Sequence, residues 1–154
     1  MKQKAALFLL TAVALVFAGC AAKTGDFSVA DIAQKLSQDI PFSDPLSPIE
    51  TDVAMRLYEI APEDVREAAV YVGTGGATVD EVSVWKATDS AAAVRIEQAV
   101  RERVQAQKTV YQDYQPAEIP KLDHPVVLVH GDVVILCVSG FEEQAREILS
   151  ASLS

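Results

Sequence analysis

The sequence has few of the residues that carry nucleophilic or metal chemistry. Its 154 residues include two cysteines, Cys20 and Cys137, and two histidines, His124 and His130. The histidines are expected at opposite ends of one strand, about 20 Å apart at roughly 3.3 Å per residue, so they cannot share a metal ion. The sequence therefore predicts no metal site, no cofactor and no catalytic triad.

Basic residues are also scarce. Thirteen Lys and Arg residues oppose 22 Asp and Glu residues, which gives a formal net charge of −9. A negative field of this kind repels phosphate backbones and anionic lipid headgroups, so neither nucleic-acid binding nor a polybasic membrane contact is expected. Cations, basic peptides and cationic ligands are the partners that this charge favours.

The chain has no apolar run long enough to span a bilayer, which needs about 20 residues. Its longest run, Ala5–Phe17, follows two lysines and precedes Ala18 and Gly19, as in a secretory signal with small residues at the cleavage site. Cys20 comes next, and the segment that ends there resembles the lipobox of bacterial lipoproteins, although Phe17 stands where Leu, Val or Ile is usual. This resemblance implies cleavage before Cys20 and attachment of a diacylglycerol to its thiol.

The predicted organisation is a signal peptide over residues 1–19, a lipidated tether over residues 20–27 and one domain over residues 28–154. Two or more acyl chains, each methylene worth about 0.8 kcal/mol, hold such a protein on the outer side of the cell membrane. Cleavage removes two lysines and no acids, so the net charge changes from −9 to −11. Cys137 then lacks a disulfide partner and is expected as a buried thiol. An ordinary cleaved signal that carries a cysteine is the alternative.

Apolar periodicity predicts the elements of the domain. Helices are expected over residues 28–40, 51–59 and 89–113 and after residue 139; strands are expected over residues 68–72, 82–87, 125–130 and 133–139. Ser28 and Asp89 are candidate N-caps, and Ser139 with Glu142 fits a capping box for the last helix. Within the second helix Val53 and Leu57, with Ile60 just after it, are expected to face inward; the prolines at 41, 45 and 48 are expected to be helix breakers.

Gly131 and Asp132 suit a type II′ turn between the last two strands. Both faces of this hairpin are apolar, so it is expected in the middle of a sheet, covered by helices of its own chain or by a partner. The order of elements predicts an α+β fold, with N-terminal helices followed by two ββα-like units around one mainly antiparallel sheet.

A glycine-rich segment is the sharpest local signal of the domain, and we predict that Gly73, Thr74, Gly75 and Gly76 form a ligand-binding loop. No helix start and no lysine follow them, so a dinucleotide or phosphate loop is excluded, and a flexible loop between two strands is the plainer interpretation. Asp80 and Glu81 beside the loop are added to this candidate site because carboxylates suit a hard cation or acid–base chemistry. The alternative is that both acids are a solvated loop end.

Four aromatic and proline residues are candidates for a second surface. Tyr111, Tyr114, Pro116 and Trp85 could line a peptide or carbohydrate groove, because aromatic rings give contact area at low entropic cost. Core packing is the alternative for Tyr111 and Trp85.

The segment from Tyr71 to Val82, together with Gln107, the Tyr114-Gln115-Pro116 run and Gly131 in its apolar hairpin, resembles a family of short bacterial lipoproteins. That family is catalogued as a domain of unknown function, and the resemblance covers about residues 52–148. It implies a membrane-tethered domain outside the cytoplasm and brings no catalytic residues with it.

The leading interpretation is therefore a membrane-anchored lipoprotein outside the cytoplasm that binds or scaffolds an unknown protein or envelope ligand, and the absence of a catalytic motif speaks against an enzyme. The alternative is a hydrolase acting on cell-envelope material, with acid and base drawn from Asp80, Glu81 or His124. Self-association through the apolar hairpin is a third interpretation.

Overall fold

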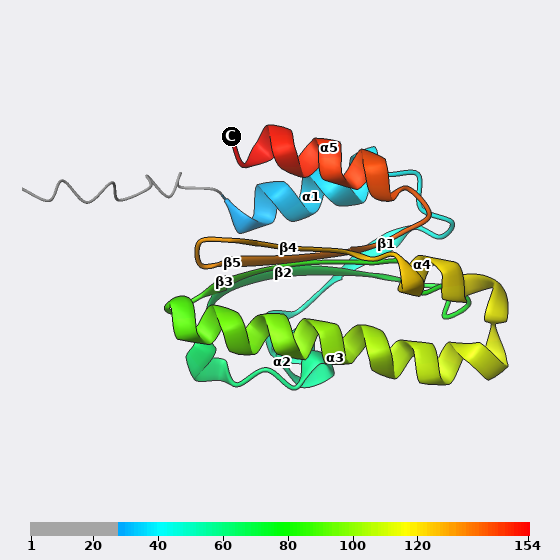
Figure 1. The fold of residues 1–154 in the computed structure, drawn as a ribbon, viewed down its shortest axis with the longest axis horizontal. Coiled ribbons are helices and arrows are strands. Elements are labelled where there is room, and N and C mark those ends of the chain that lie inside the picture. The colour runs from blue at the N-terminus through cyan, green and yellow to red at the C-terminus, as the bar shows by residue number, and fades with distance from the viewer. Residues whose placement is uncertain (1–27) are drawn as a thin grey trace, which may run out of the picture.

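The computed structural model describes residues 28–154, so the predicted signal peptide, Cys20 and the tether lie outside the described residues. A five-stranded antiparallel sheet in the order β1-β2-β3-β5-β4 lies between two layers of helices (Figure 1), which confirms the α+β class. The helices are α1 (Val29–Asp39), α2 (Thr51–Tyr58), α3 (Ser90–Tyr114), α4 (Ile119–Asp123) and α5 (Glu142–Ser152), with short 3-10 helices η1 (Pro62–Asp64) and η2 (Pro116–Glu118). The strands are β1 (Leu46–Ile49), β2 (Val65–Gly73), β3 (Glu81–Ala87), β4 (Val126–His130) and β5 (Val133–Val138).

Helices α1 and α5 cover one face of the sheet, and α2 and α3 cover the other (Figure 1).

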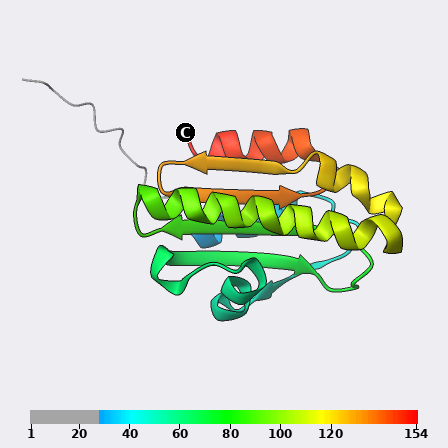
Figure 2. The same cartoon turned by 60° about the horizontal axis from the view of Figure 1, so that its bottom comes forward.

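Both predicted helix N-caps are confirmed: Ser28 accepts a hydrogen bond from the Asp31 amide at 3.2 Å, and Asp89 accepts one from the Ala92 amide at 2.8 Å. These bonds satisfy amides that the first turn of a helix leaves without partners. Figure 2 shows α3, the longest helix, lying along the strands, with β2 and β4 on either side of it.

Side-chain alternation along β3 divides the core into two clusters. Val84 packs in the cluster under α1 and α5, whereas Trp85 packs in the cluster under α2 and α3. Trp85 is fully buried and meets Tyr58 edge to face, with ring centroids 5.1 Å apart. Strand β3 is paired on both edges, so the residues at its start are held inside the molecule.

The predicted hairpin is confirmed as β4 and β5, with a positive φ of 60° at Gly131 and none at Asp132, as a type II′ turn requires. Its expected central position is correct for β5 alone. Strand β5 pairs with both β3 and β4 and is buried along its whole length, whereas β4 is an edge strand on which Val129 is 44% exposed.

Two local expectations are wrong, and one strand was missed. Helix α2 turns Ala54 and Tyr58 into the core and leaves Val53 and Leu57 partly exposed. The capping box does not form, because α5 begins at Glu142 while Ser139 accepts a hydrogen bond from the Phe141 amide instead. Strand β1, which contains Pro48, was not predicted at all; a proline is tolerated there because β1 is an edge strand. None of the helices in residues 28–154 has the length and apolar character that crossing a membrane requires.

Candidate functional site

The glycine segment connects β2 to β3 and presents an exposed tip. Residues 74–77, which we call the loop tip, are all exposed, and Gly76 has a φ of +67°, a conformation that side chains with a Cβ rarely adopt. The base of the loop is fixed by backbone hydrogen bonds, from the Gly73 amide to Asp80 O at 3.0 Å and from the Thr74 amide to Pro45 O at 3.4 Å. The loop is therefore anchored to its own hairpin and to the segment just before β1.

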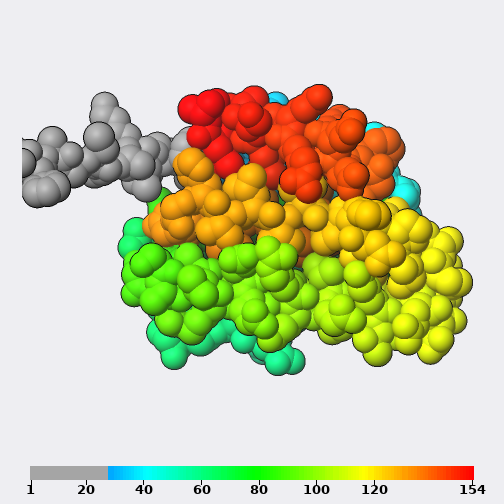
Figure 3. Space-filling view, viewed as in Figure 1, coloured from blue at the N-terminus to red at the C-terminus, as the bar shows by residue number. Residues whose placement is uncertain are grey.

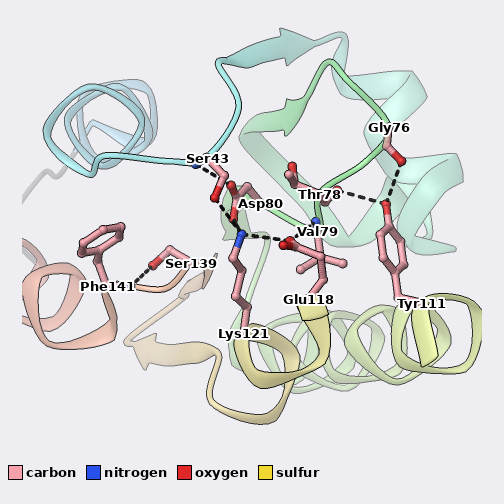
Figure 4. A network of polar contacts seen from close by, with 10 residues as sticks. All are labelled: Ser43, Gly76, Thr78, Val79, Asp80, Tyr111, Glu118, Lys121, Ser139 and Phe141. Carbon is pink, nitrogen blue, oxygen red and sulfur yellow. Dashed lines mark hydrogen bonds and ion pairs between the residues drawn. The ribbon is translucent and has the colours of Figure 1, made fainter. Parts of the chain in front are cut away.

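A second set of contacts reaches the loop from the end of α3 and from η2 (Figure 4). The Tyr111 hydroxyl donates to Thr78 O at 3.0 Å and lies 3.4 Å from Gly76 O, and Glu118 accepts from the Val79 amide at 3.1 Å. Burial, reinforced by the charge of Glu118, raises the pKa of Tyr111, so this phenol keeps its donating proton at neutral pH. Residues on both sides of the loop thus hold its backbone in place.

The carboxylate of Asp80 lies inside an ionic network beneath the loop (Figure 4). Asp80 is 2% exposed, and it accepts hydrogen bonds from Lys121 Nζ at 2.8 Å and from the Ser43 amide at 2.9 Å. Lys121 Nζ also lies 2.9 Å from Glu118. Burial alone lowers the pKa of Lys121, but the hydrogen bonds with Asp80 and Glu118 outweigh it and raise the pKa. Lys121 is therefore a structural cation at neutral pH and no general base.

Glu81 enters a different buried network, because consecutive strand residues point to opposite sides of the sheet. It is 2% exposed and accepts from Arg103 Nη2 at 2.9 Å, from Gln107 Nε2 at 3.0 Å and from the Tyr58 hydroxyl. Arg103 also lies over the Tyr58 ring, 5.7 Å from its centroid. Burial, with the neighbouring charge of Glu81, raises the pKa of Tyr58 well above its ordinary value. Burial alone lowers the pKa of Arg103, but the charge of Glu81 and the hydrogen bond to it together outweigh burial and raise the pKa.

The interpretation of Asp80 and Glu81 as a solvated loop end is therefore wrong, since both carboxylates are buried against cations of the same chain. Asp80 and Glu81 are adjacent in the sequence, but their side chains belong to separate networks, and the loop tip lies on the surface.

His124 is exposed and lines a hollow of about 240 Å³ with Lys121 and Ser139. No group of three or more His, Cys, Asp and Glu side chains in residues 28–154 is arranged to hold a metal ion.

The aromatic candidates separate into core and surface. Trp85 lies in the core, whereas Tyr114 is 63% exposed and packs edge to face against Tyr111.

Sequence reasoning missed Arg103 as a partner of Glu81. The available signal was the spacing of Arg103, Gln107 and Tyr111, which repeat every four residues on one side of α3 and all contact the start of β3 or the loop.

Cys137 has no disulfide partner within residues 28–154 and is buried, as expected. Burial raises the pKa of its thiol from 9.0 to about 12, which favours the protonated form in the folded state. The contribution of the buried thiol to stability is fully present below pH 9.0, the ordinary pKa of the unfolded thiol, and is lost as the pH rises towards 12.

We predict a steeper alkaline loss of unfolding free energy for the native protein than for Cys137→Ala, measured by urea denaturation at increasing pH. Identical alkaline profiles would contradict this assignment.

Comparisons with known proteins identify the domain but assign it no activity. No curated protein and no solved structure matches the chain. The family DUF4358, described as a domain of unknown function, matches residues 38–139, roughly two thirds of the sequence. That match includes the glycine loop and both buried networks and confirms the resemblance to a domain of unknown function, while the lipoprotein character stays a prediction. The chain therefore belongs to the DUF4358 family.

Proposed function

We propose that this chain is a membrane-anchored lipoprotein that acts outside the cytoplasm, and that its domain is a binding or scaffolding module with the loop tip as its contact surface. The anchor is proposed from the sequence that ends at Cys20. The binding role is proposed from the shape and support of the loop.

One observation carries the binding role: an exposed glycine-rich tip stands on a base that is held from several directions. Pro45 contacts the loop from the segment before β1, Tyr111 from α3 and Glu118 from η2. A loop fixed in this way loses less conformational entropy when a partner binds, and its glycines let a partner approach the backbone closely. Binding residues are commonly found on loops of this kind, positioned by a rigid scaffold.

The position of the loop in the domain also supports this role. The start of α1 lies towards one end of the molecule, and the connection from β2 to β3 lies at the other end, beside α4 (Figure 1). In the space-filling view the end of α3 and α4 form that same far end (Figure 3). A partner can therefore reach the loop from the side opposite the proposed tether.

The hydrolase alternative gains no support from the positions of its candidate acids. Asp80 and Glu81 are each 2% exposed and each is held by a cation of the same chain. General acid–base catalysis needs a group within hydrogen-bond reach of a substrate. Neither carboxylate is therefore placed to act on a substrate.

The anchor is tested by metabolic labelling with an alkyne fatty acid in the native host. The native protein is expected to carry the label and to sediment with membranes, and the Cys20→Ser variant is expected to lose the label. Unlabelled native protein, or native protein in the cytosolic fraction, would overturn this part of the proposal.

The contact surface is tested by placing a photo-crosslinking amino acid at Thr74, which is exposed in the loop tip, and at Glu143, an exposed control on α5. Irradiation of intact cells is expected to give a discrete adduct from position 74 and none of the same mass from position 143. The same adduct from both positions, or none from position 74, would show that the loop tip is not the contact surface.

A further inference from the structure

The last turn of α3 continues the surface of the glycine loop. Tyr111 and Tyr114 stack edge to face, with ring centroids 6.1 Å apart and an interplanar angle of 76°. The Tyr111 hydroxyl reaches the backbone of Gly76 and Thr78, so this ring pair adjoins the loop directly (Figure 4). Tyr114 is 63% exposed. A large aromatic ring therefore stands in solvent next to the exposed backbone of the loop tip.

Two carboxylates come from the segments that form this surface. Asp44 lies against the loop tip, because its Oδ2 atom is 2.5 Å from the point that a Cβ at Gly75 would occupy. Asp113 precedes Tyr114 and is exposed. Within residues 28–154 neither Asp44 nor Asp113 makes an ion pair, whereas Lys121 on α4 is held by Asp80 and Lys108 on α3 by Asp123. The negative charge at this end of the domain is therefore available to a partner.

An exposed tyrosine face, uncompensated carboxylates and exposed backbone carbonyls are the groups that recognise a guanidinium. Arginine stacks on an aromatic face and binds carboxylates through two parallel N–H donors. The formal net charge of −9, or −11 after the proposed cleavage, attracts such a partner over longer range.

We infer that Asp44, the loop tip, Asp113 and Tyr114 together bind an arginine-rich segment of a partner protein. This inference rests on the proposed binding function and names the chemistry of the partner. Arginine side chains of the partner stack on Tyr114 and pair with Asp44 and Asp113, while its backbone contacts the loop tip. The partner and the loop are thus matched in charge as well as in shape.

The test measures the fluorescence anisotropy of a labelled oligoarginine peptide with the full lipidated chain in neutral detergent at physiological salt. Tyr114→Ala is expected to weaken binding about tenfold, equivalent to about 1.4 kcal/mol, while Tyr114→Phe retains it because the ring remains. The matched control is Val94→Ala, which shortens another exposed side chain of α3, 66% exposed, and should change binding less than about twofold.

The charge contribution is tested separately. The double variant Asp44→Asn/Asp113→Asn is expected to weaken binding about tenfold, whereas Glu143→Gln/Glu147→Gln, with the same change in net charge on α5, should have an effect below about threefold. Equal losses in both pairs would show that net charge alone attracts the peptide and would overturn the inference.

Other outcomes separate this inference from the proposed function. Failure of oligoarginine to bind, with a crosslinked partner still captured at position 74, would overturn the arginine-rich partner and leave the binding role intact. If sedimentation shows a dimer that Tyr114→Ala dissociates, a second copy of the chain occupies the surface and the inference is wrong. Because Tyr114 is largely exposed, unchanged thermal unfolding is expected for both Tyr114 variants and excludes misfolding as the cause.

Discussion

The Arg103→Met variant is expected to lose about 3–5 kcal/mol of unfolding free energy. The side chain of Arg103 is 20% exposed and pairs with Glu81, which is 2% exposed, at 2.9 Å. Removal of the guanidinium leaves an ionised carboxylate between β3 and α3, where Gln107 and Tyr58 donate hydrogen bonds but bring no positive charge. A loss of this size is a large part of the total stability of about 5–15 kcal/mol that is usual for a domain. Urea denaturation of the purified protein measures it.

The chain provides a matched control two residues away on the same helix. Arg101 is 56% exposed and pairs with Glu97 one turn earlier, so Arg101→Met should cost no more than about 0.5 kcal/mol. The double variant Glu81→Leu/Arg103→Met removes both charges and should be more stable than Arg103→Met, because no buried charge is left without a partner. Equal losses for Arg101→Met and Arg103→Met would show that the Glu81 pair adds no more than a surface ion pair.

Local signals in the sequence were sufficient for most of the fold. Ser28 and Asp89 cap their helices with bonds to amides three residues away, and Gly131 bends the hairpin through its own backbone conformation. Each of these features depends on a few neighbouring residues. Strand β1 depends on none, because its four residues include Pro48 and become a strand through pairing with β2.

The orientation of α2 could not be predicted because a distant side chain decides it. Counting apolar residues favoured Val53 and Leu57 for the core. The structure buries Tyr58 instead, whose hydroxyl bonds Glu81 23 residues later and whose ring packs on Trp85. A tyrosine is buried readily when its hydroxyl finds such a partner, and this partner is not visible in the local pattern.

The same argument explains the candidate site. The loop tip was found because glycines at this density indicate a loop wherever they occur. The burial of Asp80 and Glu81 was missed because their cations, Lys121 and Arg103, come 41 and 22 residues later. Adjacent acids after a loop are ordinarily solvated, and tertiary contacts alone reverse this expectation.

Replacement of Lys121 has an expected effect on stability as large as that of Arg103, and this effect reaches the glycine loop. Lys121→Met should cost about 3–5 kcal/mol, because it leaves Asp80, 2% exposed, with the Ser43 amide as its remaining donor and with Glu118 nearby as a second negative charge. The raised pKa of Lys121 sets the pH dependence: its contribution is fully present below its ordinary pKa of 10.5 and is lost as the pH rises through the higher folded value. The native protein and the variant should therefore converge in stability at strongly alkaline pH.

The local consequence of Lys121→Met distinguishes support of the loop from general destabilisation. The Gly73 amide bonds the backbone of Asp80, and the Val79 amide bonds Glu118, so both should exchange hydrogen faster once the cation between the two acids is gone. Lys35→Met is the matched control, since Lys35 is 51% exposed, pairs with Asp39 within α1 and should cost no more than about 0.5 kcal/mol. Unchanged exchange at Gly73 and Val79 in Lys121→Met would mean that the loop base is stable without the ionic network. Faster exchange there, with α5 amides unaffected, would show that the buried charges hold the base on which the loop tip stands.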